Sequence, residues 1–78
     1  MATIGMIGAG SWGIALSVLL CNNGHQVTVW SALPEEIAEL KEKREHRTLP
    51  GVLMPEGMEV TTEVEEAMRE KDLLVTAV

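Results

Sequence analysis

A cluster of glycines near the amino terminus constrains this chain more than any other feature. Gly8, Gly10 and Gly13 follow the short apolar run 3–7, and a mostly apolar stretch from Ser11 to Asn23 comes after them. The run before the glycines is partly β-branched, as in a strand buried on both faces, and the stretch after them is typical of a largely buried helix. The sequence therefore predicts a strand that turns sharply into a helix.

The remaining sequence continues to alternate between strand and helix patterns. The first helix stops at Asn23-Gly24, and apolar or β-branched runs predict further strands at residues 26–30, 58–61 and 73–78. This spacing implies right-handed βαβ crossovers and a parallel sheet, so the fold class is α/β, one half of a doubly wound sheet of about four strands and three helices. Such a half leaves a sheet edge and an apolar face uncovered, and we expect residues 1–78 to be the amino-terminal part of a larger domain without its substrate domain.

Two further helices are expected between these strands. One begins at Pro34, a favoured first helical position, and runs to about Arg44. The other opens with the capping box Thr62-Glu63-Val64-Glu65. Residues 46–58 form a loop whose length is more often functional than incidental. The positions expected to face inward are Ile37 and Leu40 in the first of these helices, and Val64, Ala67 and Met68 in the second.

Composition argues against several classes of function. The 78 residues carry 6 basic and 12 acidic side chains, and a net charge of −6 disfavours nucleic acid and anionic membranes. No apolar run approaches the roughly 20 residues of a transmembrane helix. The single Cys21 suits a reducing cytoplasm and a thiol that only packs, with its pKa raised at a helix carboxyl end. His25 and His46 have no further ligands at metal spacing, so no metal site is predicted and both are expected to be solvated loop residues.

The glycine cluster fits the pattern G-x-G-x-x-G in the context that makes it informative, between a strand and a helix. Gly8 would permit the tight turn, Gly10 would let a pyrophosphate approach the backbone, and Gly13 would let the helix lie close to the strand. The unpaired amides of the first helical turn and the helix dipole stabilise an anion without a basic side chain. The sequence therefore predicts a nicotinamide dinucleotide site in an acidic protein.

Neighbouring residues extend this predicted site. Ser11 is expected to cap the helix and face the phosphates, and Trp12 either packs in the core or walls the cofactor cleft. The second strand ends in Trp30-Ser31-Ala32, where an NAD site usually has a carboxylate for the ribose, so Ser31 is the candidate donor. The glutamates of the next helix favour NAD over NADP. No residue present could take the proton released in hydride transfer, so no catalytic residue is assigned.

Several segments together resemble the amino-terminal part of bacterial NAD(P)-dependent glycerol-3-phosphate dehydrogenase: residues 4–16, Asn23-Gly24-His25, Val29-Trp30, residues 34–37 and Leu49-Pro50-Gly51-Val52. The resemblance covers essentially the whole chain. It implies a Rossmann-type fold, a cytoplasmic oxidoreductase that interconverts dihydroxyacetone phosphate and sn-glycerol 3-phosphate, and a role in phospholipid synthesis. It also implies cofactor contacts from Gly8, Gly10, Ser11, Trp12 and Gly13.

The same resemblance places the catalytic lysine beyond Val78, so this piece alone is expected to be inactive. Two places depart from the family pattern. Many relatives have a basic residue where Ala32 stands, and an Asn and an aromatic residue where His46 and Thr48 stand.

Two other classes of protein fit the same glycine cluster. A nucleotide-binding sensor or regulatory Rossmann module would use it without chemistry, and another Rossmann reductase of the hydroxyacid or ketopantoate type would use it for a different substrate. A lysine-bearing second domain after Val78 would separate an enzyme from a sensor. The sequence does not indicate an oligomeric state, and a homo-oligomer stays open.

Overall fold

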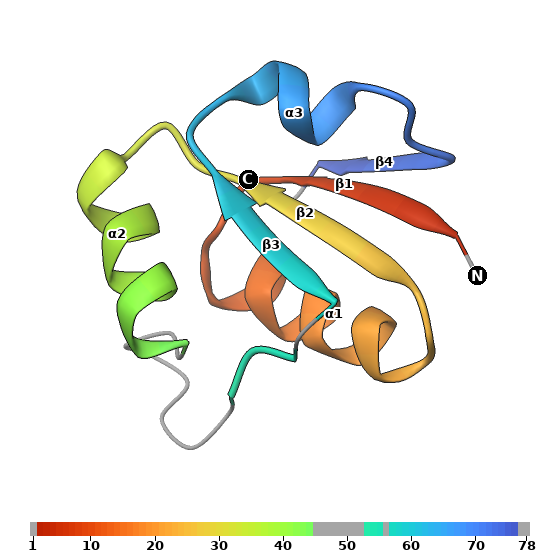
Figure 1. Cartoon of the computed structure of the whole chain (residues 1–78), viewed down its shortest axis with the longest axis horizontal. Helices are drawn as coiled ribbons and strands as arrows, with labels where there is room; N and C mark the ends of the chain where they lie inside the picture. The colour runs from red at the N-terminus through yellow and green to blue at the C-terminus, as the bar shows by residue number, and fades with distance from the viewer. Residues whose placement is uncertain (1, 45–52, 56, 77–78) are drawn as a thin grey trace.

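Parallel strands form one sheet, and helices connect them (Figure 1). The computed structural model of the chain describes residues 2–44, 53–55 and 57–76. The elements are β1 (Thr3–Ile7), α1 (Ser11–Asn22), β2 (Gln26–Trp30), α2 (Pro34–Lys43), β3 (Met58–Thr61), α3 (Val64–Met68) and β4 (Leu73–Thr76). The strands predicted at 3–7, 26–30 and 58–61 are confirmed. The last strand is confirmed over 73–76, and most of the loop predicted at 46–58 lies outside the described residues.

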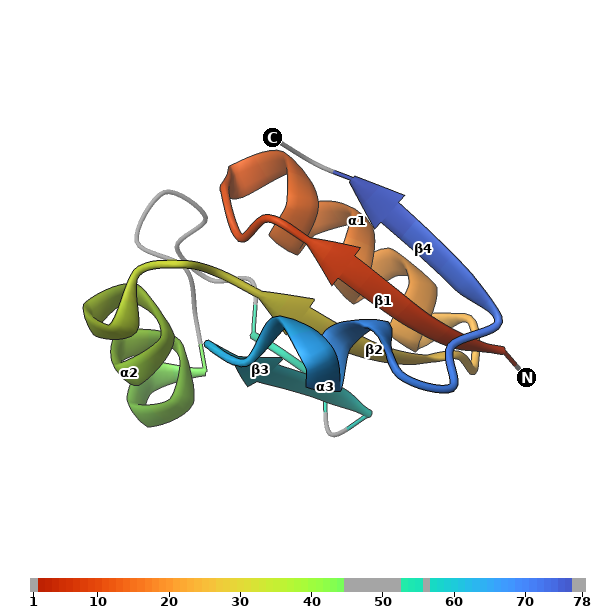
Figure 2. The ribbon, with the colours of Figure 1, turned by 90° about the horizontal axis from the view of Figure 1, so that it is seen from above.

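The order of the strands is β3-β2-β1-β4, with every neighbouring pair parallel. The chain moves in one direction from β1 to β3 and then returns across β1 to reach β4. Right-handed crossovers therefore put α1 and α2 on one face of the sheet and α3 on the other. Figure 2 shows α1 and α3 on opposite sides of the sheet. The predicted α/β half of a doubly wound sheet is confirmed.

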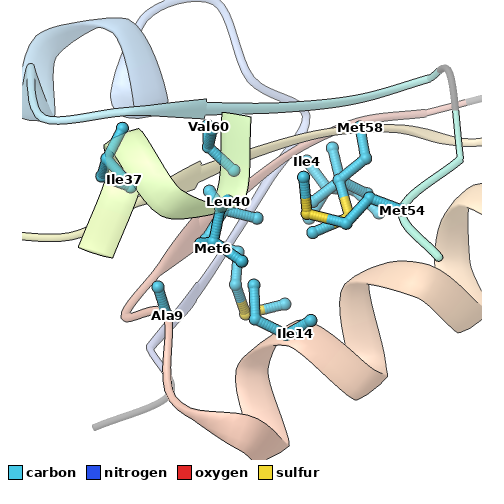
Figure 3. Close-up of a cluster of buried hydrophobic side chains, with 11 residues drawn as sticks. Ile4, Met6, Ala9, Ile14, Ile37, Leu40, Met54, Met58 and Val60 are labelled. Carbon is cyan, nitrogen blue, oxygen red and sulfur yellow. The ribbon is translucent and has the colours of Figure 1, made fainter. Parts of the chain in front are cut away.

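The hydrophobic core lies between the sheet and the two helices α1 and α2, which cover the same face of it (Figure 3). Alternate residues of each strand point to this face, and register places Ile4, Val27 and Met58 side by side. The predicted inner residues of α2, Ile37 and Leu40, are buried as expected. The full cluster is Ile4, Met6, Ala9, Ile14, Val27, Val29, Ile37, Leu40, Met54, Met58 and Val60.

The opposite face of the sheet is covered by the short helix α3, which approaches very closely. A Cβ built on Gly5 would overlap the carbonyl oxygen of Ala67 and lie 2.7 Å from Cδ2 of Leu74. Ala67 is fully buried, as predicted, but Val64 and Met68 are 39% and 50% exposed. The expectation that these two side chains face inward is wrong because a five-residue helix rests on the sheet through its smallest residue.

The predicted capping box at the start of α3 is also wrong. The N-cap residue is Glu63, and it makes no side-chain capping hydrogen bond. Instead, the hydroxyl oxygen of Thr61 accepts a hydrogen bond from the Glu63 amide at 3.0 Å. Thr61 is the last residue of β3, so its side chain, and not that of Thr62, turns the chain into the helix.

Helix α1 is less buried than its apolar sequence predicts. Ile14 and Ser17 are fully buried against the sheet, whereas Trp12 is 65% and Leu19 is 57% exposed. The helix packs on the sheet through one side, and Trp12, Ala15, Leu19 and Asn22 are exposed on the other. The predicted stop is confirmed, because Asn23 is the C-cap and Gly24 has a φ of +94°.

Strand β4 lies at an edge of the described sheet, beside β1. Leu73 and Leu74 are both about half exposed, on opposite faces of the strand. The predicted uncovered edge and apolar face are therefore present in the part of the chain that the structure describes. The start of this strand is tied to the start of β1, because the Asp72 carboxylate accepts hydrogen bonds from the amide and hydroxyl of Thr3 at 2.9 and 3.2 Å.

Candidate functional site

The chain leaves β1 through a turn that only glycine adopts readily. Gly8 has a φ of +120°, a conformation in which a Cβ is strained. Its amide donates to the carbonyl oxygen of Trp30 at 2.9 Å, which extends the ladder between β1 and β2 by one residue. The tight turn predicted at Gly8 is confirmed, and its amide is directed to the protein and not outward.

The first turn of α1 presents backbone amides at the carboxyl edge of the sheet. Gly10 is the N-cap residue and makes no side-chain capping hydrogen bond. The amide of Ile14 donates to the Gly10 carbonyl oxygen at 3.0 Å, so the amides that precede Ile14 in α1 have no acceptor within the helix. Such amides and the positive end of the dipole make a favourable environment for a phosphate group.

Space in front of these amides is open at Gly10. A Cβ built there would meet no heavy atom within 4 Å, and the backbone has an extended conformation that any residue adopts. No contact within the protein therefore requires glycine at this position. This position fits a pyrophosphate, because the absence of a side chain at residue 10 leaves open the space that a ligand needs to reach the amides.

Two other residues of the predicted site lie in the first turn of α1. Trp12 is 65% exposed, so the alternative in which its indole packs in the core is wrong, and the ring lies beside the exposed helix start. Gly13 is buried, and its carbonyl oxygen accepts a hydrogen bond from the Ser17 hydroxyl at 2.7 Å. The side chain of Ser11 lies outside what the structure describes.

The carboxyl end of β2 forms the other part of the predicted site. Ser31 is buried, its amide donates to the Thr61 carbonyl oxygen at 3.2 Å, and its hydroxyl oxygen accepts from the Leu33 amide at 3.2 Å. Ser31 therefore shapes the turn into α2 and retains a hydroxyl hydrogen that could be donated to a ligand. Ala32 is exposed, and no carboxylate lies between Trp30 and Leu33.

Residues outside this edge have structural roles. Burial raises the pKa of the Cys21 thiol, the direction predicted, and a backbone hydrogen bond with Val27 and the charge of Arg44 oppose the shift. His25 is half-buried and its Nδ1 accepts from the Ala2 amide at 3.0 Å, so the expectation of a solvated loop residue is wrong. His46 lies outside the described residues.

The part of the chain that the structure describes contains neither a cluster of metal-ligating side chains nor a membrane-spanning helix. Among residues 2–44, 53–55 and 57–76, no three His, Cys, Asp or Glu side chains are grouped so that they could hold a metal ion. No helix in the same ranges has the length and apolar character that crossing a membrane requires.

A parallel sheet in the order β3-β2-β1-β4, with a glycine turn between its first strand and an exposed helix start, defines the class of Rossmann-type dinucleotide-binding domains. Comparison with known families gives a more specific result. Residues 3–78 match the family described as NAD-dependent glycerol-3-phosphate dehydrogenase N-terminus, and the chain belongs to this family.

Proteins similar to this chain are named as glycerol-3-phosphate dehydrogenases, in agreement with the family match. The chain is 53% identical over 79 residues to the NAD(P)+ glycerol-3-phosphate dehydrogenase of Agathobacter rectalis, and 50% identical over 78 residues to a second such enzyme of Lactobacillus delbrueckii subsp. bulgaricus. Each match covers 100% of this chain but only 24% and 23% of those proteins. The crystal structure of glycerol-3-phosphate dehydrogenase from Coxiella burnetii superposes with a TM-score of 0.91 at 24% identity, over 99% of this chain and 24% of that one, and shows the shared fold.

Proposed function

We propose that this chain is the dinucleotide-binding part of an oxidoreductase that interconverts dihydroxyacetone phosphate and sn-glycerol 3-phosphate with NAD(P)H. Family membership and the names of the relatives support this reaction. The observation that carries the binding role is the open approach to the α1 amides at Gly10. The proposal includes a cytoplasmic location and a supply of glycerol phosphate to phospholipid synthesis.

The chain spans only 23% and 24% of the length of these relatives, so we propose that cofactor binding and catalysis belong to different parts of the longer protein. We assign residues 1–78 to the cofactor, and the substrate and catalytic groups to a further domain of the longer protein. Bound nicotinamide would supply the hydride to the carbonyl carbon of dihydroxyacetone phosphate, or accept it in the reverse direction. The chain described here would hold the cofactor and would not turn over by itself.

Six residues are proposed as the cofactor contacts. The turn at Gly8 aims the chain into α1, the backbone at Gly10 lets the pyrophosphate reach the helix amides, and Gly13 would let the helix lie close to β1. Ser11 opens this first turn and Trp12 follows it, and the exposed indole of Trp12 would wall the cleft. Ser31 would donate its hydroxyl hydrogen to the adenosine ribose at the end of β2.

NAD is the cofactor that we propose in preference to NADP. The end of β2 offers the small, exposed Ala32 where a cation would be needed to pair with a 2′-phosphate. Glu35 and Glu36 lie in the first turn of α2, directly after this position. Negative charge there disfavours a phosphate more than a neutral ribose hydroxyl.

Titration of the chain with NADH by calorimetry tests the binding role. Gly10→Val should weaken the affinity by about tenfold or more, because its side chain fills the space in front of the amides. Its thermal unfolding temperature should fall only modestly, through the loss of a good N-cap residue, since a Cβ there meets no atom within 4 Å apart from its chain neighbours. Gly57→Ala, in the turn before β3 and only in ordinary contact with the His25 carbonyl at 3.6 Å, is the control. Unchanged affinity in Gly10→Val would refute the assignment of the loop.

Assays on the longer protein test the reaction. Dihydroxyacetone phosphate should drive oxidation of NADH, followed by absorbance at the nicotinamide band. Binding of NADH without oxidation would favour the sensor alternative. Oxidation only with a hydroxyacid-type or ketopantoate-type substrate would favour the other reductases.

A further inference from the structure

Trp30 is joined by hydrogen bonds to both neighbouring strand ends. Its backbone carbonyl oxygen accepts from the Gly8 amide at 2.9 Å, in the turn that follows β1. Its indole Nε1 donates to the carbonyl oxygen of Thr62 at 2.9 Å, in the connection between β3 and α3. One residue at the end of β2 therefore ties the glycine turn on one side to the start of the α3 connection on the other.

The contact with Thr62 fixes backbone and not a side chain. An indole N–H is only a donor, and here its acceptor is a main-chain carbonyl, so the identity of residue 62 does not matter to the bond. The next amide, that of Glu63, is held by the hydroxyl oxygen of Thr61 at 3.0 Å. The Trp30 bond thus joins the β3–α3 connection to the end of β2, and the Thr61 bond fixes the turn within the connection itself.

The role of Trp30 in the hydrophobic core is small. Its ring is only half-buried, and the buried cluster beneath α1 and α2 does not include it. An aromatic side chain of the same size without an N–H would cover similar apolar area. The specific contribution of tryptophan at this position is therefore the hydrogen bond.

The place of this contact is significant because dinucleotides lie with the adenosine ribose at the end of the second strand. Ser31, the proposed ribose donor, directly follows Trp30, and its amide donates to the Thr61 carbonyl oxygen at 3.2 Å. We propose that Trp30 is a positioning residue for the adenosine half of the cofactor, holding Ser31 and the Thr62 backbone in register with the glycine turn. This inference rests on the proposed function.

The test uses ADP-ribose as the probe and compares Trp30→Phe with Thr62→Ala. Trp30→Phe keeps a large ring and removes the donor, so ADP-ribose should bind roughly three to ten times more weakly. Thr62→Ala keeps the backbone carbonyl and should bind within about twofold of wild type. Affinities are measured by calorimetry at a temperature where circular dichroism shows every variant to be folded, so that a loss of stability alone leaves the dissociation constant unchanged.

A spectroscopic readout makes the test independent of the folding of Trp30→Phe. Trp12 and Trp30 are the only aromatic residues of the chain, so in Trp12→Phe the emission is that of Trp30 alone. Saturating ADP-ribose should shift or quench this emission in a concentration-dependent way. An emission that does not respond, while calorimetry shows binding, would overturn the proposal.

The remaining outcomes separate the role of Trp30 from the binding role of the glycine loop. Equal affinity of wild type and Trp30→Phe would overturn the role of Trp30 and leave the binding role of the glycine loop standing. Equal losses in Trp30→Phe and Thr62→Ala would also overturn it, because the side chain of residue 62 would then matter. No binding of ADP-ribose or NADH by the wild-type chain would overturn the proposed function, and this inference with it.

Discussion

Gly5 of β1 lies directly against the backbone of Ala67 in α3, so closely that a Cβ at Gly5 would overlap the Ala67 carbonyl oxygen. The same Cβ would lie 2.7 Å from Cδ2 of Leu74. Backbone cannot move aside as the end of a flexible side chain can, so α3 would have to shift from the sheet. We expect Gly5→Ala to lower the free energy of unfolding by about 1–3 kcal/mol, measured by urea denaturation.

Gly57→Ala is the matched control for this substitution. A Cβ at Gly57 would lie 3.6 Å from the His25 carbonyl oxygen, an ordinary contact, so its free energy of unfolding should change little. Wild-type stability in Gly5→Ala would show that α3 does not rest on the sheet as described.

Arg44 closes α2 and holds the segment before β3. Its backbone has a φ of +54°, and its Nη2 donates to the carbonyl oxygens of Pro55 and Met58 at 2.7 and 3.2 Å. Arg44→Ala removes these charge-assisted bonds and should cost about 1–3 kcal/mol of unfolding free energy. Arg44→Gly should be about 1 kcal/mol more stable than Arg44→Ala, because glycine adopts the positive φ without strain. Thermal denaturation in the reverse order would contradict this account.

Asp72 makes part of the fold dependent on pH. The Thr3 amide and hydroxyl, donating to its carboxylate, hold the pKa of Asp72 below its usual value. A carboxyl group whose pKa is lowered by folding stabilises the folded state at pH values above the unfolded pKa. This contribution is lost as the pH falls from the unfolded pKa through the lower pKa of the folded state. The urea midpoint should therefore drop between about pH 5 and about pH 3, and by less in Asp72→Asn. Glu42→Gln, which removes an exposed carboxylate of α2, should retain the wild-type drop.

Ala32 is the position at which cofactor preference should be easiest to change. Arg at this exposed site would bring a cation to the end of β2, where a 2′-phosphate would lie. The ratio of the dissociation constants for NADPH and NADH should fall by about fivefold or more. Ala38→Arg adds the same charge at an exposed position further along α2 and should change the ratio less. If both ratios stay at the wild-type value, residue 32 does not face the adenosine ribose.

Most elements of the fold could be predicted because their signals are local. The strands at 3–7, 26–30 and 58–61 follow from short β-branched runs, and the turn at Gly8 follows from a backbone conformation that glycine favours. The inner residues of α2 follow from helical spacing, since Ile37 and Leu40 lie three apart on one face. Each of these conclusions needs only neighbours within a few positions along the chain.

What a side chain contacts far away along the chain was not predictable in this way. Burial of Val64 and Met68 was expected from spacing alone, but it depends on what lies opposite a helix of five residues. The same holds for Trp12, whose exposure decides between a core residue and a wall of the cleft.

By itself, the sequence determined the alternation of strands and helices, the glycine turn, and the unpaired amides at the start of α1. These features depend on intrinsic propensity and glycine stereochemistry, which act over a few residues. Only the tertiary structure decided that α3 packs directly on Gly5 and that Arg44 donates to the carbonyl oxygens of Pro55 and Met58. The same is true of the link that Trp30 makes between the glycine turn and Thr62. Those contacts join residues from 11 to 62 positions apart, and their geometry exists only once the parallel strands have been placed in order and register.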